Sequence, residues 1–241
     1  MSWHLGRLAA FDVETTGTDP EADRIVTAAL SIVGAQRAGE HHFWIVDPGV
    51  EIPAAATAVH GVTTQRARSE GVSPQQAVAE ITELLAAEVR ARVPIVAFNA
   101  RFDLTILDRE ARRHGVVPLV ERSGAADSLL VIDPYVLDKQ IDRYRPGKRT
   151  LDAVCAHYGV PLGSAHQAGA DALAAARVAY RIGTLAPELA GLDIEQLHAD
   201  QVSWAAAQAA SLQAHFRQQG RMELVQGAWP VVPAPEALAA A

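Results

Sequence analysis

Two acidic residues, Asp12 and Glu14, follow an apolar run that begins at Leu8 and ends at Phe11. Such a run is typical of a buried strand, and residues two apart in an extended chain point to the same face. Both carboxylates should therefore leave one face of the strand, where their mutual repulsion makes burial costly without a cation. Oxygen ligands of this kind suit Mg²⁺ or Mn²⁺. A strand that ends in a solvated polar turn would explain the same pair.

Two further groups of polar residues occur later in the chain. Asp103 comes shortly after an apolar run that ends at Phe98, and it should lie in the first turn of the next helix. His166 and Asp171 are five residues apart, where a loop should lead into a helix that starts at Ala168. Taken singly, these residues are better explained as a helix-terminal charge or a solvated loop side chain than as parts of a site. Only their combination with Asp12 and Glu14 indicates a site.

The apolar pattern predicts the elements that would position these groups. Three strands in succession, followed by alternating helix and strand, indicate an α/β sheet that is partly antiparallel. Besides the first strand, we expect strands over residues 24–33, 40–46, 95–97 and 127–132. We expect helices from Ser73 to before Pro94, over residues 99–114, from Thr150 to Gly159, and over residues 168–185. Residues 59–62 should lie in a loop.

Composition restricts the class of protein. The chain has 241 residues, of which 49% are hydrophobic, and this suits one globular domain with appendages. Its net charge of −7 is unusual for a protein that binds nucleic acid mainly by neutralising phosphates, so such a role would need a local site, metal ions or a partner. A single cysteine, Cys155, excludes an internal disulfide and fits the cytoplasm. The sequence shows no apolar run suited to a signal peptide or a membrane helix.

One stretch is both basic and aromatic. It contains Lys139, Arg143, Arg145, Lys148 and Arg149, together with Tyr135 and Tyr144. Cations and tyrosines of this kind can follow the phosphates and bases of a single strand. Because Asp138 and Asp142 lie among them, a solvated loop is an equally good interpretation.

The composition changes after Pro187. Residues 187–227 should form a helical extension in which Trp204, Leu212 and Phe216 share one apolar face. That face must be buried on the main domain (residues 1–186), on a second copy of the chain, or on a partner. Residues 228–241 are rich in proline and alanine and should form a flexible tail.

Together, the motifs resemble those of the DEDD exonuclease superfamily, in the subgroup with a histidine in the third motif. The order is D-x-E (Asp12, Glu14), N-x-x-x-D (Asn99, Asp103) and H-x-x-x-x-D (His166, Asp171), within roughly the first 185 residues. The similarity is greatest to the epsilon-type proofreading exonucleases of bacterial DNA polymerase III, whose V-H-G-I/V segment resembles residues 59–62. Ribonuclease T and oligoribonuclease match less well. Phe98 departs from the pattern, because many epsilon-like sequences have histidine there.

The resemblance implies a ribonuclease-H-like fold with a mixed five-stranded sheet flanked by helices. It also implies metal-dependent 3′→5′ release of nucleoside 5′-monophosphates from DNA, in proofreading or repair. Two Mg²⁺ or Mn²⁺ ions would be held by Asp12, Glu14, Asp103 and Asp171, with Asp12 bridging them and His166 as general base. Contacts to the terminal nucleotide would come from Thr15, His60, Asn99 and Phe102.

The expected partners are single-stranded or frayed 3′ ends of DNA, with RNA as a further substrate, and a DNA polymerase subunit or a second copy of the chain. Two alternatives remain: a 3′→5′ exoribonuclease, and a non-catalytic polymerase-binding module on the same fold. The complete set of four acids and a histidine argues against the second alternative.

Overall fold

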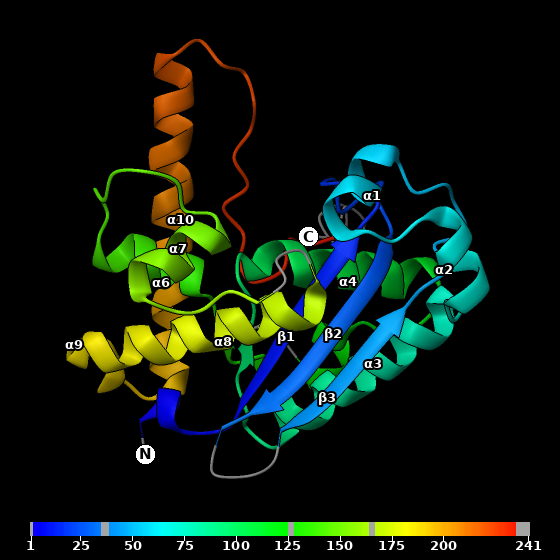
Figure 1. Cartoon of the computed structure of the whole chain (residues 1–241). Coiled ribbons are helices and arrows are strands. Elements are labelled where there is room, and N and C mark those ends of the chain that lie inside the picture. Colours follow the sequence, from blue (N-terminus) through cyan, green and yellow to red (C-terminus); the bar gives the residue numbers. More distant parts are fainter. Residues whose placement is uncertain (1, 35–38, 125–127, 164–166, 235–241) are drawn as a thin grey trace.

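The computed structural model describes residues 2–34, 39–124, 128–163 and 167–234. Its centre is a five-stranded sheet in the order β3-β2-β1-β4-β5 (Figure 1). The strands are β1 (Leu8–Thr15), β2 (Ile25–Val33), β3 (Glu40–Ile45), β4 (Ile95–Val96) and β5 (Val131–Ile132). β2 runs antiparallel to both β1 and β3, whereas β1, β4 and β5 are parallel. The expected mixed five-stranded sheet of an α/β fold is confirmed.

Helices cover both faces of this sheet. They are η1 (Trp3–Leu5, a 3₁₀ turn), α1 (Ala54–His60), α2 (Thr64–Glu70), α3 (Pro74–Arg90), α4 (Ala100–Arg113), α5 (Leu119–Ser123), α6 (Pro134–Ile141), α7 (Leu151–Tyr158), α8 (Ala168–Leu185), α9 (Pro187–Ala190) and α10 (Ile194–Gln218). The helix predicted over residues 168–185 has these bounds in the structure. Ser73 caps α3 as expected, since its hydroxyl accepts a hydrogen bond from the backbone of Gln76.

The two faces of the central strand β1 are buried against different helices. Phe11 and Val13 belong to the hydrophobic cluster that contains residues of α3 and α4. Ala10 packs instead against Ala172 and Ala176 of α8. Successive side chains of a strand alternate between faces. The two acids of β1 are even-numbered like Ala10, so they leave the sheet on the side that α8 covers.

Two sequence predictions need correction here. Residues 59–62 are not simply a loop, because α1 runs to His60 and α2 begins at Thr64. Gly61, with φ of 76°, ends α1, and Thr63 caps α2 by accepting a hydrogen bond from Arg66. The fifth strand is also shorter than predicted. Leu130 has a positive φ of 49°, which is incompatible with an extended strand, and Asp127 lies outside the described residues.

The N-terminal half of α10 covers the outer edge of β5. Nδ1 of His198 accepts a hydrogen bond from the backbone N–H of Val131 (3.0 Å), and Nε2 of Gln201 donates to the carbonyl of Val131 (2.9 Å). Oε1 of Gln201 also accepts from the backbone N–H of Asp133 (2.8 Å). An edge strand presents unpaired backbone groups, and here side chains of α10 satisfy them. The helix therefore packs on the body, whereas its C-terminal half projects beyond it (Figure 1).

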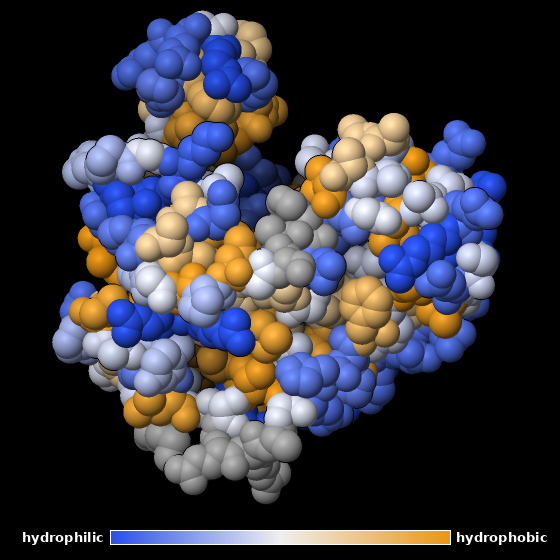
Figure 2. Space-filling view, in the orientation of Figure 1, coloured by the Kyte–Doolittle hydropathy of each residue, from blue (hydrophilic) through white to orange (hydrophobic). Residues whose placement is uncertain are grey.

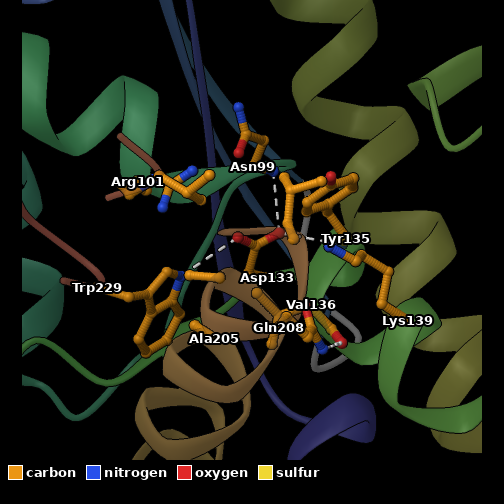
Figure 3. Close-up of a pocket in the computed structure, with 12 residues that line it drawn as sticks. Asn99, Arg101, Asp133, Tyr135, Val136, Lys139, Ala205, Gln208 and Trp229 are labelled. Carbon is orange, nitrogen blue, oxygen red and sulfur yellow. Dashed lines mark hydrogen bonds between the residues drawn. The ribbon is translucent and has the colours of Figure 1, made fainter. Parts of the chain in front are cut away.

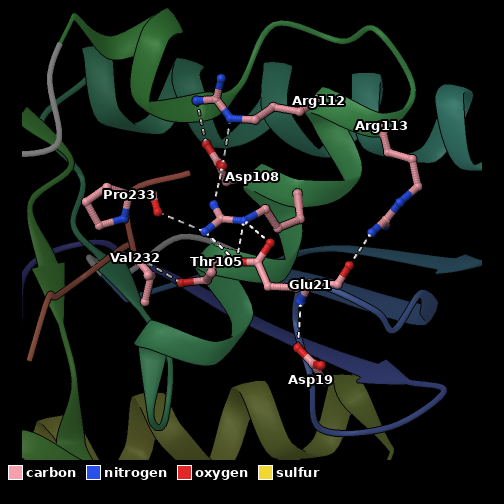
Figure 4. Close-up of polar contacts among 9 residues, drawn as sticks. Asp19, Glu21, Thr105, Asp108, Arg112, Arg113, Val232 and Pro233 are labelled. Atoms are coloured by element: carbon pink, nitrogen blue, oxygen red, sulfur yellow. Dashed lines mark hydrogen bonds and ion pairs between the residues drawn. The ribbon is translucent and has the colours of Figure 1, made fainter. Parts of the chain in front are cut away.

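Residues 228–234 are packed, contrary to the expectation of a flexible tail from residue 228. Trp229 is buried in the main hydrophobic cluster. The backbone N–H of Val232 donates to Oγ1 of Thr105 (3.0 Å), and Nη2 of Arg109 donates to the carbonyl of Pro233 (3.1 Å) (Figure 4). A large apolar ring and fixed hydrogen bonds outweigh the proline-rich composition. Only residues 235–241 of the expected tail lie outside the described part.

Candidate active site

Three carboxylates meet where β1 ends. Asp12 and Glu14 come from β1, and Asp171 comes from the first turn of α8. One oxygen of each carboxylate lies within 4.8 Å of the others. The pairing of β1 with β2 shifts register between Glu14 and Thr15, so the regular strand ends at this cluster. The i, i+2 spacing and the helix start thus converge as the sequence predicted.

The fourth acid, Asp103, lies beside this cluster in the first turn of α4 and is buried. Its Oδ1 accepts a hydrogen bond from the backbone N–H of Val13 (3.1 Å). That N–H is available because β4 pairs with β1 only at Ala9 and Ala10. The short strand β4 therefore leaves room for a helix-borne carboxylate between the two acids of β1.

The electrostatics of the cluster suit a cation. Burial raises the pKa of Asp12 well above its ordinary value, and the negative charges of Asp103, Glu14 and Asp171 raise it further. Burial likewise raises the pKa of Asp103, although the hydrogen bond from the backbone of Val13 lowers it. Carboxylates that destabilise one another in this way are relieved by a divalent ion with a preference for oxygen. The residues therefore fit the metal site that the motifs predicted.

Two of the predicted substrate contacts border the cluster. Nδ1 of His60 accepts a hydrogen bond from the backbone N–H of Val62 (3.2 Å). Burial lowers the pKa of His60, whereas the backbone of Thr15 raises it. Thr15 and His60 therefore lie next to each other. His60 also lines a cavity together with Gln167 and Ala168 at the start of α8. His166 itself lies outside the described residues.

The other two predicted contacts flank the start of α4. Asn99 adopts a left-handed conformation, with φ of 62°, at the N-cap of that helix. Phe102 is half-buried against the main hydrophobic cluster, so ordinary packing accounts for its position.

Asp133 is a buried residue directly after β5 that the sequence motifs did not indicate. Its two oxygens accept hydrogen bonds from the backbone N–H groups of Asn99, Ala100 and Tyr135 and from Nε1 of Trp229 (Figure 3). Burial raises its pKa from 3.8 to about 6, although these donors favour the charged form. Asp133 thereby holds the turn that starts α4 and positions Asp103. An aspartate before proline, directly after an apolar run, is the helix-cap signal that would have found it.

The basic and aromatic stretch is only partly available for binding. Asp138 is fully buried and pairs with Arg145 (2.7 Å) and with Arg149 (2.5 Å), so these two cations stabilise the turn after α6. The alternative interpretation as a solvated loop is wrong for the first part of this stretch, because Tyr135 and Lys139 lie in α6.

The described helices include none with the length and apolar character needed to cross a membrane.

A mixed sheet whose central strand ends in paired carboxylates, joined by acids from the first turns of two helices, defines a nuclease of the ribonuclease-H-like class. A family model described as "Exonuclease" (RNase_T) matches residues 9–179. The chain therefore belongs to this exonuclease family, and the predicted membership of the DEDD 3′→5′ exonucleases is confirmed.

Relatives and solved structures agree with this assignment. The chain is 44% identical, over 103 residues, to a DNA polymerase III subunit epsilon-like protein of Rhodobacter capsulatus, covering 42% of this chain and 14% of the relative. It is 29% identical over 196 residues to a PolC-type DNA polymerase III of Streptococcus thermophilus, covering 80% of this chain and 12% of that protein. The chain thus spans a small part of these curated relatives.

Among solved structures, E. coli Exonuclease I in complex with a dT13 oligonucleotide superposes with a TM-score of 0.66. The sequence identity is 22%, with 76% of this chain and 42% of the other covered. Exonuclease I from Methylocaldum szegediense gives a TM-score of 0.61 at 24% identity, with 77% and 42% covered. At these identities the likeness concerns the fold.

Proposed function

We propose that this protein is a metal-dependent 3′→5′ exonuclease that releases nucleoside 5′-monophosphates from the 3′ ends of DNA. The observation that carries the proposal is the convergence of Asp12, Glu14 and Asp171 within 4.8 Å, with Asp103 beside them. Its relatives are named as a DNA polymerase III subunit epsilon-like protein and as PolC-type DNA polymerase III, which favours DNA as substrate and a role in proofreading or repair.

Two Mg²⁺ or Mn²⁺ ions would be held by these four carboxylates. When bound, such ions activate a water molecule and stabilise the charge of the departing 3′ oxygen. The mutual repulsion that raises the pKa of Asp12 supports this assignment, because bound cations would remove it.

The remaining roles belong to residues around the cluster. His166 would accept a proton from the attacking water, a task for which an imidazole with an ordinary pKa near 6.5 suits neutral pH. Thr15 and His60 would hold the terminal nucleotide, and their adjacency supports a shared contact. Asn99 and Phe102 would contact the same nucleotide from the start of α4.

Degradation of a single strand labelled at its 5′ end tests the proposal. We expect a ladder that shortens from the 3′ end, no cleavage in EDTA, and recovery with Mg²⁺ or Mn²⁺. Asp12→Ala should abolish cleavage, whereas Glu51→Ala, which removes an exposed carboxylate elsewhere, should not. A parallel RNA strand measures the preference between the two nucleic acids. An active Asp12→Ala variant, or internal cuts in a circular strand, would contradict the proposal.

A further inference from the structure

A groove runs along the seam between α6 and α10, and we refer to it as the α6–α10 groove. Two adjoining hollows form it, and they share Tyr135, Lys139, Gln208 and Leu212. Its wall on α10 extends from Trp204 to His215, which corresponds to roughly 16 Å of helix. The C-terminal end of α10 projects from the rest of the molecule (Figures 1 and 2), and Leu212 in the wall of the groove is 40% exposed.

The inner end of the groove adjoins the candidate active site. Asn99 lines it, and Asn99 caps the helix whose first turn carries Asp103 (Figure 3). The ring of Tyr135 lies edge-on to Phe98, at 5.7 Å between ring centroids. A polymer whose 3′ end reaches the acid cluster could therefore continue along this groove.

The charge of the groove is opposite to that of the whole protein. Arg101, Lys139 and Arg143 line it, and the structure gives none of them an ion pair with a carboxylate among the described residues. Arg101 donates to the carbonyl of Gln226, and Arg143 donates to Oγ of Ser211 (3.3 Å). In a protein of net charge −7, this arrangement is suited to a polyanion.

Aromatic side chains alternate with these cations. Nζ of Lys139 lies 4.7 Å from the ring centroid of Tyr135, and the guanidinium of Arg143 lies 5.8 Å from that of Tyr144. Tyr144 is 86% exposed, so its ring face is available to a ligand. Stacking on aromatic rings beside phosphate-binding cations is how proteins hold single strands without reading sequence.

On this basis, and resting on the proposed function, we infer that the α6–α10 groove binds single-stranded DNA upstream of the 3′ nucleotide that is removed. Lys139 and Arg143 contact phosphates, and Tyr144 stacks on a base. The helical extension thus takes part in substrate binding and lengthens the binding site beyond the acid cluster.

Binding in EDTA tests this inference without depending on cleavage. The probe is a fluorescent oligo(dT) of about 12 nucleotides, a length that one single-strand-binding fold can cover. The double variant Lys139→Gln/Arg143→Gln should bind more weakly and with a smaller salt dependence. Each lost phosphate contact lowers the slope of log K against log salt by about 0.7, so two contacts lower it by about 1.4. The ratio of wild-type to variant affinity should therefore be about 25-fold larger at 0.1 M salt than at 1 M salt.

A matched control keeps the change in net charge the same. Arg68→Gln/Arg90→Gln neutralises two exposed arginines on α2 and α3, away from the groove, and should retain the wild-type slope. Tyr144→Ala should lose affinity about fivefold or more with the slope unchanged, because stacking involves no counterions, and Tyr144→Phe should restore it.

The possible outcomes separate the two proposals. A groove variant that binds oligo(dT) with wild-type affinity and slope overturns the inference, as does an equal loss in the control variant. A groove variant that instead keeps the wild-type slope of log K against log salt and fails to retain a polymerase subunit in pull-down would identify the groove as a protein contact. That result would also overturn the inference. Failure of the wild type to cleave any 3′ end with Mg²⁺ would contradict only the proposed function, since binding is measured without catalysis.

Discussion

At the scale of single residues, the acid cluster depends on a further buried carboxylate, that of Asp133, which lies outside the predicted set of four acids. Asp133 holds the backbone of Asn99 and Ala100 and so determines where α4 begins. Asp103 follows within one turn and reaches the backbone of Val13. The buried carboxylate of Asp133, which accepts four hydrogen bonds, thus positions the carboxylate of Asp103.

The pKa of Asp133 predicts a dependence of stability on pH. Because folding raises this pKa from 3.8 to about 6, the folded state binds the proton more tightly than the unfolded state. The free energy of unfolding should therefore fall as pH rises through this window, by about 3 kcal/mol from this group. Urea unfolding of wild type and Asp133→Asn in EDTA, at pH values across the window, measures the difference. Parallel profiles for the two proteins would contradict this assignment.

At the scale of elements, α10 completes the sheet by means of side chains. Gln201 bonds both to the carbonyl of Val131 and to the backbone N–H of Asp133, so one amide serves two buried groups. This explains why a fully buried glutamine is found in an otherwise apolar contact.

Replacing Gln201 by alanine should leave both backbone groups without a partner. Each buried unsatisfied group costs about 1–3 kcal/mol, so we expect a destabilisation of about 2–6 kcal/mol in urea unfolding. Gln196→Ala on the same helix serves as control, because Gln196 is exposed, and its cost should stay within about 0.5 kcal/mol. Equal effects of the two substitutions would show that the contact with β5 contributes little.

At the scale of the whole molecule, the helical extension and residues 228–234 pack on the body that contains the sheet. Leu197 of α10 belongs to one hydrophobic cluster, and Trp229 belongs to the other. Arg109, which pairs with Glu21 at 2.7 Å, also holds the backbone of Pro233. The extension therefore covers the β5 edge, and the following residues 228–234 cover α4 (Figure 4).

Truncation after Leu185 should accordingly give a protein that aggregates or melts at much lower temperature, because it exposes β5 and removes Trp229. Burial of a tryptophan alone is worth about 3–5 kcal/mol. Light scattering and thermal unfolding compare the truncated protein with the full chain. A soluble, active protein that ends at Leu185 and loses only a polymerase partner would identify the extension as a docking element instead.

Local sequence patterns were sufficient for much of this molecule. The strand and helix that carry Asp12 and Asp171 follow from runs of apolar residues, and the i, i+2 spacing places Asp12 and Glu14 on one face for purely geometric reasons. The helix bounds of α8 and the cap at Ser73 are equally local. The order of the motifs was enough to indicate the family.

The tertiary structure alone decided the features that depend on distant partners. The positive φ of Leu130 shortens β5, and the pairing of Arg145 and Arg149 with buried Asp138 withdraws two cations from the surface. Trp229 orders a segment whose composition is typical of a loose tail. These outcomes depend on contacts between different segments of the chain, and periodicity within one segment carries no information about such contacts.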